Sequence, residues 1–187
     1  MRVGVLASGF GSNLGAILER VHGRDGIQVV AVGSDKPEAF ALQRAQEAGI
    51  TTSVFARDDF PNRPARDEAM AAWLESQGVE LVVLAGYMQL VTPGFLKRFP
   101  DRVINVHPAL LPAFPGLHAV EQALEYGVKV FGVTVHHVDE GVDSGAIIAQ
   151  RAVELPDART ADEVMDALRP LEHELLTDVV RAFAGAV

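Results

Sequence analysis

Short, valine-rich apolar segments alternate in this chain with segments whose apolar residues recur at helical spacing. This alternation limits the possible folds more than any other feature. Strands that alternate with helices form a mostly parallel sheet, and helices then cover both of its faces. We therefore expect an α/β fold. The expected parallel strands are 2–7, 28–34, 51–55, 81–85 and 103–106.

The segments between these strands are expected to be helices. Apolar residues from Leu14 to Val21 recur at spacings of three and four, so this helix should turn one face toward a core. Thr92 and Pro93 form a cap followed by a proline, which favours a short helix there. The other expected helices are 37–48, 64–78 and 119–126.

The C-terminal third has a different pattern. The strand-like runs 130–138 and 146–153 are separated only by a polar loop, so we expect them to pair antiparallel. A capping box at Thr160–Glu163 opens a long amphipathic helix, and Pro170 inside it should kink or split the helix. The sequence thus predicts a single three-layer domain over 1–187, with a mostly parallel Rossmann-like sheet and a partly antiparallel C-terminal part.

Length and charge exclude several classes of protein. The 187 residues suffice for one domain with a good core, and the lack of cysteine excludes disulfides and thiolate chemistry. A net charge of −9 disfavours nucleic-acid binding, which needs clustered basic residues. No apolar run is long enough for a membrane span, and the N-terminus does not resemble a signal peptide. We therefore expect a cytoplasmic protein.

A glycine-containing loop follows the first strand. Gly9–Asn13 leads directly into a helix, whose N-terminus offers unpaired N–H groups and a partial positive charge. The loop lacks the third glycine of a dinucleotide fingerprint, because position 14 is Leu. It could cradle a phosphate or be only a tight turn. Asp35, after the second strand, could bind a ribose.

The fifth strand ends in the most distinctive stretch, Val103–Gly116. Asn105 and His107 are two residues apart, so strand alternation puts their side chains on the same face. Pro108 should end the strand and begin a stiff, proline-rich loop. A carboxamide and an imidazole at a strand end could serve chemistry, although a lone histidine there could equally be structural.

An acidic glycine loop, Asp139–Gly145, lies between the last two strands. Its glycines would let Asp143 approach a ligand closely. The loop lacks the spacing of a calcium site, and His107 and His118 match no metal signature, so no metal is expected. A solvated acidic loop is the plain alternative.

Six segments spread over the chain form a combined pattern. They are S-G-F-G-S-N (8–13), L-A-G-Y-M (84–88), I-N-V-H-P-A-L-L-P-A-F-P-G (104–116), G-V-T-V-H (132–136), D-E-G-V-D-S-G-A-I-I-A-Q (139–150) and E-H (172–173). Together they resemble the phosphoribosylglycinamide formyltransferases, folate-dependent enzymes of purine synthesis. The resemblance implies a single formyltransferase domain, with a nucleotide-phosphate half over 1–100 and a catalytic, folate-binding half over 101–187. It also implies 10-formyltetrahydrofolate as cosubstrate, and a monomer or homodimer that acts on small molecules.

The resemblance also implies roles for individual residues. The implied catalytic residues are Asn105, His107 and Asp143. The residues implied to bind glycinamide ribonucleotide are Gly11, Ser12, Asn13 and Glu172. Those implied to bind folate are Arg63, Met88, Gln89, Leu90, Val91, Asn105, Asp139, Glu140, Gly141, Val142 and Asp143.

Three other functions compete with this one. A formyltetrahydrofolate hydrolase or a methionyl-tRNA formyltransferase would share the catalytic motif, but neither needs the G-S-N segment for a nucleotide phosphate. A non-catalytic nucleotide-binding module would make no use of the catalytic set. The chain departs from the family at Gln89, where an arginine is common, and at Pro170, which bears on the placement of Glu172.

Overall fold

A computed structural model describes residues 1–185, so the last two residues of the predicted domain lie outside the described part. One seven-stranded sheet has the order β3-β2-β1-β4-β5-β6-β7. The first five strands are parallel, and β6 and β7 are antiparallel to their neighbours. The strands are β1 Arg2–Leu6, β2 Gln28–Ser34, β3 Thr51–Val54, β4 Leu81–Leu84, β5 Val103–His107, β6 Val130–His137 and β7 Ile147–Glu154.

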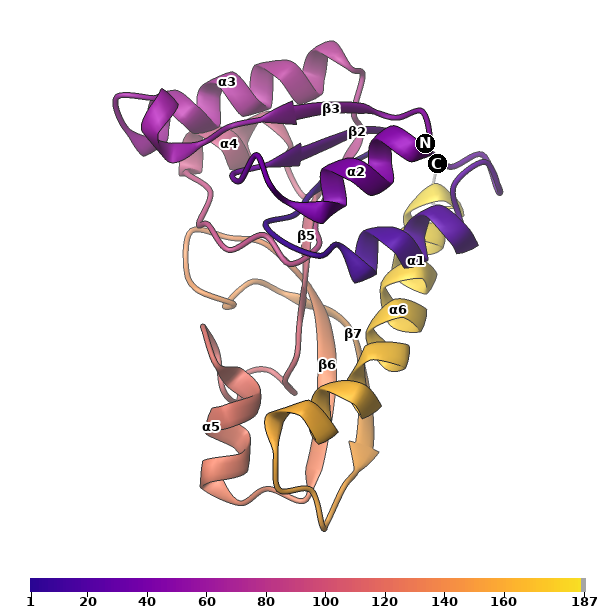
Figure 1. Cartoon of the computed structure of the whole chain (residues 1–187), viewed down its shortest axis with the longest axis vertical. Helices are drawn as coiled ribbons and strands as arrows, with labels where there is room; N and C mark the ends of the chain where they lie inside the picture. The colour runs from indigo at the N-terminus through magenta and orange to yellow at the C-terminus, as the bar shows by residue number, and fades with distance from the viewer. Residues whose placement is uncertain (186–187) are drawn as a thin grey trace.

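Helices cover both faces of the sheet (Figure 1). One apolar core lies between the sheet and α1, α2, α5 and α6, and a second lies between the sheet and α3 and α4. The expected three-layer α/β fold is therefore confirmed. The helices are α1 Ser12–Arg20, α2 Phe40–Glu47, α3 Arg63–Ser76, α4 Pro93–Arg98, α5 Ala119–Tyr126 and α6 Ala161–Gly185, with a short 3-10 helix η1 at Arg57–Asp59.

The strands at the centre of the sheet are apolar because both of their faces are covered. All four residues of β4 are buried, as are Val3–Leu6 of β1. The edge strand β7 instead carries mostly exposed or half-buried residues. Its pairing with β6 is antiparallel, as the sequence predicted.

The loops at the carboxyl ends of the parallel strands are joined to one another. The backbone N–H of Ser8, after β1, donates to the carbonyl of Gly86, after β4 (3.0 Å). The N–H of Ala41, in α2, donates to the carbonyl of Gly9 (3.1 Å). Gly11 has a φ of 72°, and a Cβ there would lie 2.7 Å from the Cβ of Ala41. Only glycine therefore fits at this position.

Several boundaries differ from the prediction. Helix α2 begins at Phe40 rather than at residue 37, because the N–H of Ala39 closes a turn on Lys36 and Ala39 itself is extended. Strand β5 continues through His107 and ends before Pro108. Strand β7 begins and ends one residue later than predicted. The 3-10 helix η1 was not predicted.

The capping box at the start of α6 forms as expected, because Thr160 and Glu163 exchange hydrogen bonds of 3.2 Å. Pro170 does not split α6, which is one helix that bends along its course (Figure 1). Buried Val164 precedes the proline and buried Leu175 follows it. Packing on both sides holds the two parts in one helix despite the missing N–H.

Candidate active site

The antiparallel pairing of β5 with β6 places a second histidine beside the predicted catalytic residues. Asn105 lies opposite His136 in the register, and His107 lies opposite Thr134. The amide nitrogen of Asn105 is 3.2 Å from Nε2 of His136. Nδ1 of His136 lies 2.8 Å from the carbonyl oxygen of His137. A carbonyl can only accept, so this nitrogen carries a proton.

Asp143 lies at the centre of this group. Its Oδ2 accepts the N–H of Gly116 (2.8 Å) and lies 3.3 Å from Nδ1 of His107. Its Oδ1 accepts from Nδ2 of Asn105 (3.4 Å) and lies 3.5 Å from Nε2 of His136. The loop between β6 and β7 therefore supplies a carboxylate to side chains from both strands. The structure brings together the three residues that the sequence singled out.

These contacts decide the charge of Asp143. The hydrogen bond with His136 lowers the pKa of Asp143 most. The N–H of Gly116 and the charge of His107 lower it further, whereas burial raises it. Asp143 therefore stays ionised at neutral pH. A φ of 51° at Asp143 holds the backbone in the left-handed region. A non-glycine residue is strained there.

The second ring nitrogen of His107 is also engaged. Nε2 of His107 lies 2.8 Å from the carbonyl oxygen of Phe114. This nitrogen therefore donates a proton to the carbonyl. Phe114 has a φ of 54° and belongs to the proline-rich loop. The carbonyl of Phe114 on one side and the carboxylate of Asp143 on the other thus fix the imidazole ring.

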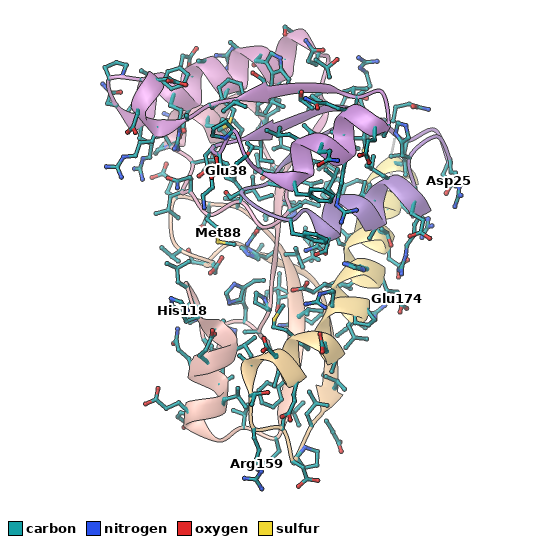
Figure 2. All side chains as sticks on the ribbon, viewed as in Figure 1. Asp25, Glu38, Met88, His118, Arg159 and Glu174 are labelled. Atoms are coloured by element: carbon teal, nitrogen blue, oxygen red, sulfur yellow. The ribbon has the colours of Figure 1, made fainter. Side chains whose placement is uncertain are left out.

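A cavity of about 460 Å³ opens beside His107, and a smaller one of about 80 Å³ opens beside His136. Asn105 and Asp143 line both cavities. Met88 and His118 line the larger one, and Figure 2 shows the two side chains on the same side of the molecule. The other predicted folate-binding residues that line one or both cavities are Gln89, Leu90, Val91, Asp139, Glu140, Gly141 and Val142.

The predicted phosphate loop forms the N-terminus of α1. Gly11 is the cap residue, and no side chain caps the helix. The first N–H groups of the helix, which include those of Ser12 and Asn13, are the ones that have no partner within an α-helix. Oδ1 of Asn13 is buried, and no hydrogen-bond partner for it occurs within residues 1–185. This arrangement suits a ligand that carries two groups. An anionic group would bind the free N–H groups, and a hydrogen-bond donor would bind Oδ1 of Asn13.

Glu172, from α6, lies beside this loop. Its carboxylate accepts a hydrogen bond from Asn13, and only 6% of the residue is exposed. Burial raises the pKa of Glu172 to about 7, although the Asn13 bond and the nearby Arg169 oppose the shift. The two predicted substrate-binding segments, far apart in sequence, are thus neighbours in space.

A buried serine connects the phosphate loop with the folate-side loop. The hydroxyl of Ser8 donates to Oδ1 of Asp35 (2.5 Å) and accepts the backbone N–H of Met88 (2.8 Å). The sequence had suggested Asp35 as a ribose-binding residue, whereas its observed contact is with Ser8. One hydroxyl thereby fixes the start of the segment 88–91 against the end of β1.

Arg63 lies apart from the catalytic group. It lines a third cavity, of about 750 Å³, together with Arg57, Arg66 and Gln89. Gln89 lines all three cavities, so the cavity of Arg63 adjoins the predicted catalytic region at this residue. Nη1 of Arg66 donates to Oε1 of Gln89 (3.3 Å), and Arg66 also pairs with the buried Asp67 (2.9 Å).

Sequence reasoning missed three parts of this site. His136 was part of a recognised motif but had no assigned role, and only the register of β5 and β6 places it against Asn105. The hydrogen bond from Met88 to Ser8 and the one that joins His107 to the carbonyl of Phe114 are encoded by no motif. Contacts of this kind depend on the folded backbone rather than on spacing along the chain.

The described residues offer neither a cluster of metal ligands nor a membrane-spanning helix. Within residues 1–185, no group of three or more acidic or histidine side chains could hold a metal ion. The same residues include no helix long and apolar enough to cross a bilayer. The site is therefore described by its side chains and backbone groups alone.

Comparison with known proteins identifies the family. The profile described as "Formyl transferase" matches residues 1–180. The phosphoribosylglycinamide formyltransferase of Bacillus subtilis is 40% identical over 182 residues, which cover 97% of this chain and 93% of the relative. The chain belongs to the phosphoribosylglycinamide formyltransferase family.

Other members of this family agree with that assignment. The phosphoribosylglycinamide formyltransferase of Mycobacterium tuberculosis H37Rv is 44% identical over 183 residues, covering 98% of this chain and 85% of the relative. The crystal structure of glycinamide ribonucleotide transformylase 1 from Symbiobacterium toebii has a TM-score of 0.96 and 46% identity, covering 100% of this chain and 88% of that one. The similarity therefore extends over the whole described fold.

Proposed function

We propose that this protein transfers the formyl group of 10-formyltetrahydrofolate to the amine of glycinamide ribonucleotide, a step of purine biosynthesis. The products are formylglycinamide ribonucleotide and tetrahydrofolate. Family membership over nearly the full length supports the reaction. The single observation in the structure that carries it is the contact of Asn105, His107 and Asp143 at one cavity.

The chemistry needs groups that stabilise a developing oxyanion. The substrate amine attacks the formyl carbon, and the carbonyl oxygen becomes negatively charged in a tetrahedral intermediate. Asn105 and His107 carry N–H groups that can donate to this oxygen. One well-placed donor of this kind contributes about 3 kcal/mol to transition-state stabilisation. Asp143, held ionised, stabilises the positive charge of a protonated His107 and accepts a proton from the attacking amine through water. His107 gives its proton to the folate nitrogen as the bond between that nitrogen and the formyl carbon breaks, so the formyl group stays on the amine and tetrahydrofolate leaves.

The required donors are engaged within the protein before substrate binds. The longest of these bonds, at 3.4 Å, joins Asn105 to Asp143. The formyl oxygen can replace the carboxylate there at small cost, because a bond of this length is weak. His107 must exchange its 2.8 Å bond with the carbonyl of Phe114. Hydrogen bonds of a catalytic group often realign only in the substrate complex.

The ribonucleotide is bound by the loop after β1 and by α6. The backbone amides at Gly11, Ser12 and Asn13 bind its phosphate, because a helix N-terminus attracts an anion. Glu172 binds near the amine of the same substrate. The hydrogen bond between Asn13 and Glu172 supports this division, since it places the two groups side by side.

The formyl donor occupies the other part of the site. The folate ring lies in the cavity between the segments 88–91 and 139–143. Exposed apolar side chains of Met88, Leu90 and Val142 line this space, as a flat aromatic ligand requires. Arg63 contacts the folate beyond Gln89.

The wider setting of the enzyme remains a prediction. A net charge of −9 supports small-molecule partners over nucleic acid. We infer a cytoplasmic monomer or homodimer that requires no metal, with the nucleotide phosphate bound in the half 1–100 and catalysis in the half 101–187.

The deciding experiment follows folate absorbance with and without glycinamide ribonucleotide. Consumption of 10-formyltetrahydrofolate should depend on the ribonucleotide and should yield one formylglycinamide ribonucleotide per folate. Consumption that does not need the ribonucleotide would instead indicate a hydrolase. The absence of turnover in both cases, together with binding of a nucleotide, would indicate a non-catalytic module.

A further inference from the structure

The segment that joins β4 to α4 has no regular secondary structure, yet it borders the catalytic cavity. It runs from residue 85 to residue 92, and its residues Met88, Gln89 and Leu90 line the cavity beside His107. Met88 and Leu90 are more than half exposed, so packing of these side chains does little to hold the backbone. Buried Tyr87 and Val91 anchor the segment in the core that packs against α3 and α4, so hydrogen bonds matter most at the exposed residues between them, 88 to 90.

The Tyr87 hydroxyl donates to Sδ of Met70 in α3 (3.7 Å), and three further side chains from other parts of the chain bond to the segment. At its start, the hydroxyl of Ser8 accepts the N–H of Met88 (2.8 Å). At its end, Oδ2 of Asp67 accepts the N–H of Thr92 (2.7 Å). Between them, Arg66 donates to the side chain of Gln89 (3.3 Å). Of these three bonds, only the one to Ser8 fixes a peptide group of a residue that lines the catalytic cavity.

The direction of the Ser8 hydroxyl is itself fixed. It donates its proton to Oδ1 of Asp35 (2.5 Å), and both residues are buried. A hydroxyl has one proton, so a proton given to Asp35 leaves the lone pairs free to face Met88. The backbone N–H of Ser8 also donates to the carbonyl of Gly86 (3.0 Å). Ser8 thus contacts both Gly86 and Met88 from the end of β1.

We propose that Ser8 is a positioning residue for the formyl donor, because its hydroxyl, oriented by Asp35, holds the 86–88 backbone in the shape that the donor requires. The inference rests on the proposed function, since it takes a formyl folate as the occupant of the cavity. Ser8 touches neither the donor nor the reacting atoms and acts through Met88. It also precedes the phosphate loop directly, so one residue sets the spacing between the two substrate sites.

The test is Ser8→Ala, assayed with 10-formyltetrahydrofolate and glycinamide ribonucleotide. We expect the KM for the formyl donor to rise about tenfold, the effect of losing one or two buried hydrogen bonds. The value of kcat should stay within about twofold, because Asn105 and His107 lie on β5 and keep their contacts. The KM for the ribonucleotide should also stay within about twofold, because the backbone N–H of Ser8 still bonds to Gly86.

A buried serine on the neighbouring strand provides a matched control. Ser34 ends β2, is 1% exposed, and uses its hydroxyl to accept the N–H of Lys36 (3.0 Å). Ser34→Ala therefore removes the same group from a similar environment without touching the segment 85–92. It should lower thermal stability less than Ser8→Ala, which also leaves the carboxylate of Asp35 without its donor, and it should leave the KM for the formyl donor unchanged. An equal rise of this KM in both variants would show that it reflects a general loss of packing rather than the loss of the bond to Met88. That result would overturn the proposal.

Asp35 tests whether the hydroxyl acts through its orientation. Asp35→Asn keeps an acceptor for Ser8 and should leave the KM for the donor within about threefold of the wild type. Asp35→Ala removes the acceptor, so its KM should approach that of Ser8→Ala. In the double variant Ser8→Ala/Asp35→Ala, the two effects should not multiply, because both act on one bond to Met88. Multiplying effects would show that Asp35 acts by another route and would overturn the link.

The double variant also guards against a failure to fold. Ser8→Ala leaves the buried carboxylate of Asp35 without its donor, and an unsatisfied buried group is costly. Replacing both residues removes that orphaned group, so the KM can be measured in a folded protein even if the single variant is unstable. A normal KM for the donor in this double variant would overturn the positioning role.

The outcomes separate this inference from the function on which it rests. An unchanged KM in Ser8→Ala, with normal ribonucleotide-dependent turnover, would overturn the role of Ser8 and leave the function standing. Absence of ribonucleotide-dependent turnover in the wild type would overturn the function itself.

Discussion

Two carboxylates of the site, Asp143 and Glu172, occupy contrasting environments. The pKa of Asp143 is lowered by its hydrogen bonds with His136 and with the N–H of Gly116, and by the charge of His107. Glu172 is buried against α1 with Asn13 as a hydrogen-bond donor, so its pKa rises to about 7. Burial raises the pKa of both groups, but Glu172 is buried more deeply, whereas Asp143 has more hydrogen-bond donors and two imidazoles beside it.

The difference suggests separate tasks for the two carboxylates. A group that is ionised at neutral pH can stabilise positive charge on its neighbours and is free to accept a proton from the amine. A group that titrates near neutral pH can gain or lose its proton as the amine of a substrate arrives. Pairs of carboxylates whose environments move their pKa values apart are typical of acid–base sites.

The largest effect is expected from Asp143→Asn. This change removes the charge between the two imidazoles, and kcat should fall roughly 100- to 1,000-fold. The pH profile of kcat should also change, because the charge beside His107 is lost. The control is Asp157→Asn, at an exposed position of a loop outside the site, where kcat should be unaffected. An unchanged pH profile would contradict the coupling of Asp143 with His107.

His107→Ala separates the imidazole from the charge of Asp143. If His107 donates to the oxyanion, kcat should fall roughly 100-fold or more, while the KM for the ribonucleotide changes little. His118→Ala offers a comparison, because this imidazole lines the same cavity but is exposed and lies 3.7 Å from Glu121. Its effect on kcat should be far smaller. Near-normal turnover of His107→Ala would remove it from the catalytic role.

Glu172→Gln tests the other carboxylate through stability. The pKa of Glu172 is higher in the folded state than its ordinary 4.5, so the folded protein holds the proton more tightly between about pH 4.5 and 7. The free energy of unfolding therefore falls as pH rises through this window. The variant should match the wild type at pH 4 and exceed its stability at pH 8 by about 3 kcal/mol, the free energy that corresponds to a pKa of about 7 in place of 4.5.

Denaturant unfolding at the two pH values measures this difference. The matched control is Glu174→Gln, which lies two residues farther along α6 with its side chain exposed (Figure 2). The control should change stability little at either pH. Equal stability of Glu172→Gln and wild type at pH 8 would show that the pKa of Glu172 is not raised. The contrast with Asp143 would then be wrong. The KM for the ribonucleotide should also rise in Glu172→Gln.

The sequence predicted the framework of this site better than its internal contacts. The alternation of strands and helices predicted the parallel sheet, and spacing put Asn105 and His107 on one face. Asp143 received a role only through the family resemblance, because a loop carries no periodic signal. The place of His136 could not be found, since it depends on a register set by the long connection from residue 108 to residue 129.

Local rules failed where tertiary packing opposed them. Pro170 could have split the last helix, but buried residues on both sides of the proline keep α6 continuous. Pro37 suggested a helix start, but a turn at Lys36–Ala39 delays α2. At Pro170 a backbone cost of about 3 kcal/mol was overcome by the packing of α6, whereas at Pro37 a local turn simply moved the start of the helix.

The smallest effect is expected from Arg169→Gln, which tests whether donors or charges set the two carboxylates apart. Arg169 is about half exposed and pairs with Asp166 (3.0 Å), and its charge lowers the pKa of Glu172 against burial. Removing the charge should raise this pKa only slightly, because water screens an exposed cation. The midpoint of the pH-dependent stability change should therefore move slightly upward.

The control is Arg181→Gln, which removes an arginine from the same helix that also pairs with an aspartate three residues before it (3.3 Å). Because Arg181 lies three turns farther along α6, the midpoint should stay at its wild-type value in this variant. A large upward shift in Arg169→Gln alone would mean that Arg169, and not the Asn13 donor, limits the pKa of Glu172. The contrast with Asp143 would then be one of neighbouring charges rather than of hydrogen-bond donors, and Asn13→Ala would change the midpoint less than Arg169→Gln does.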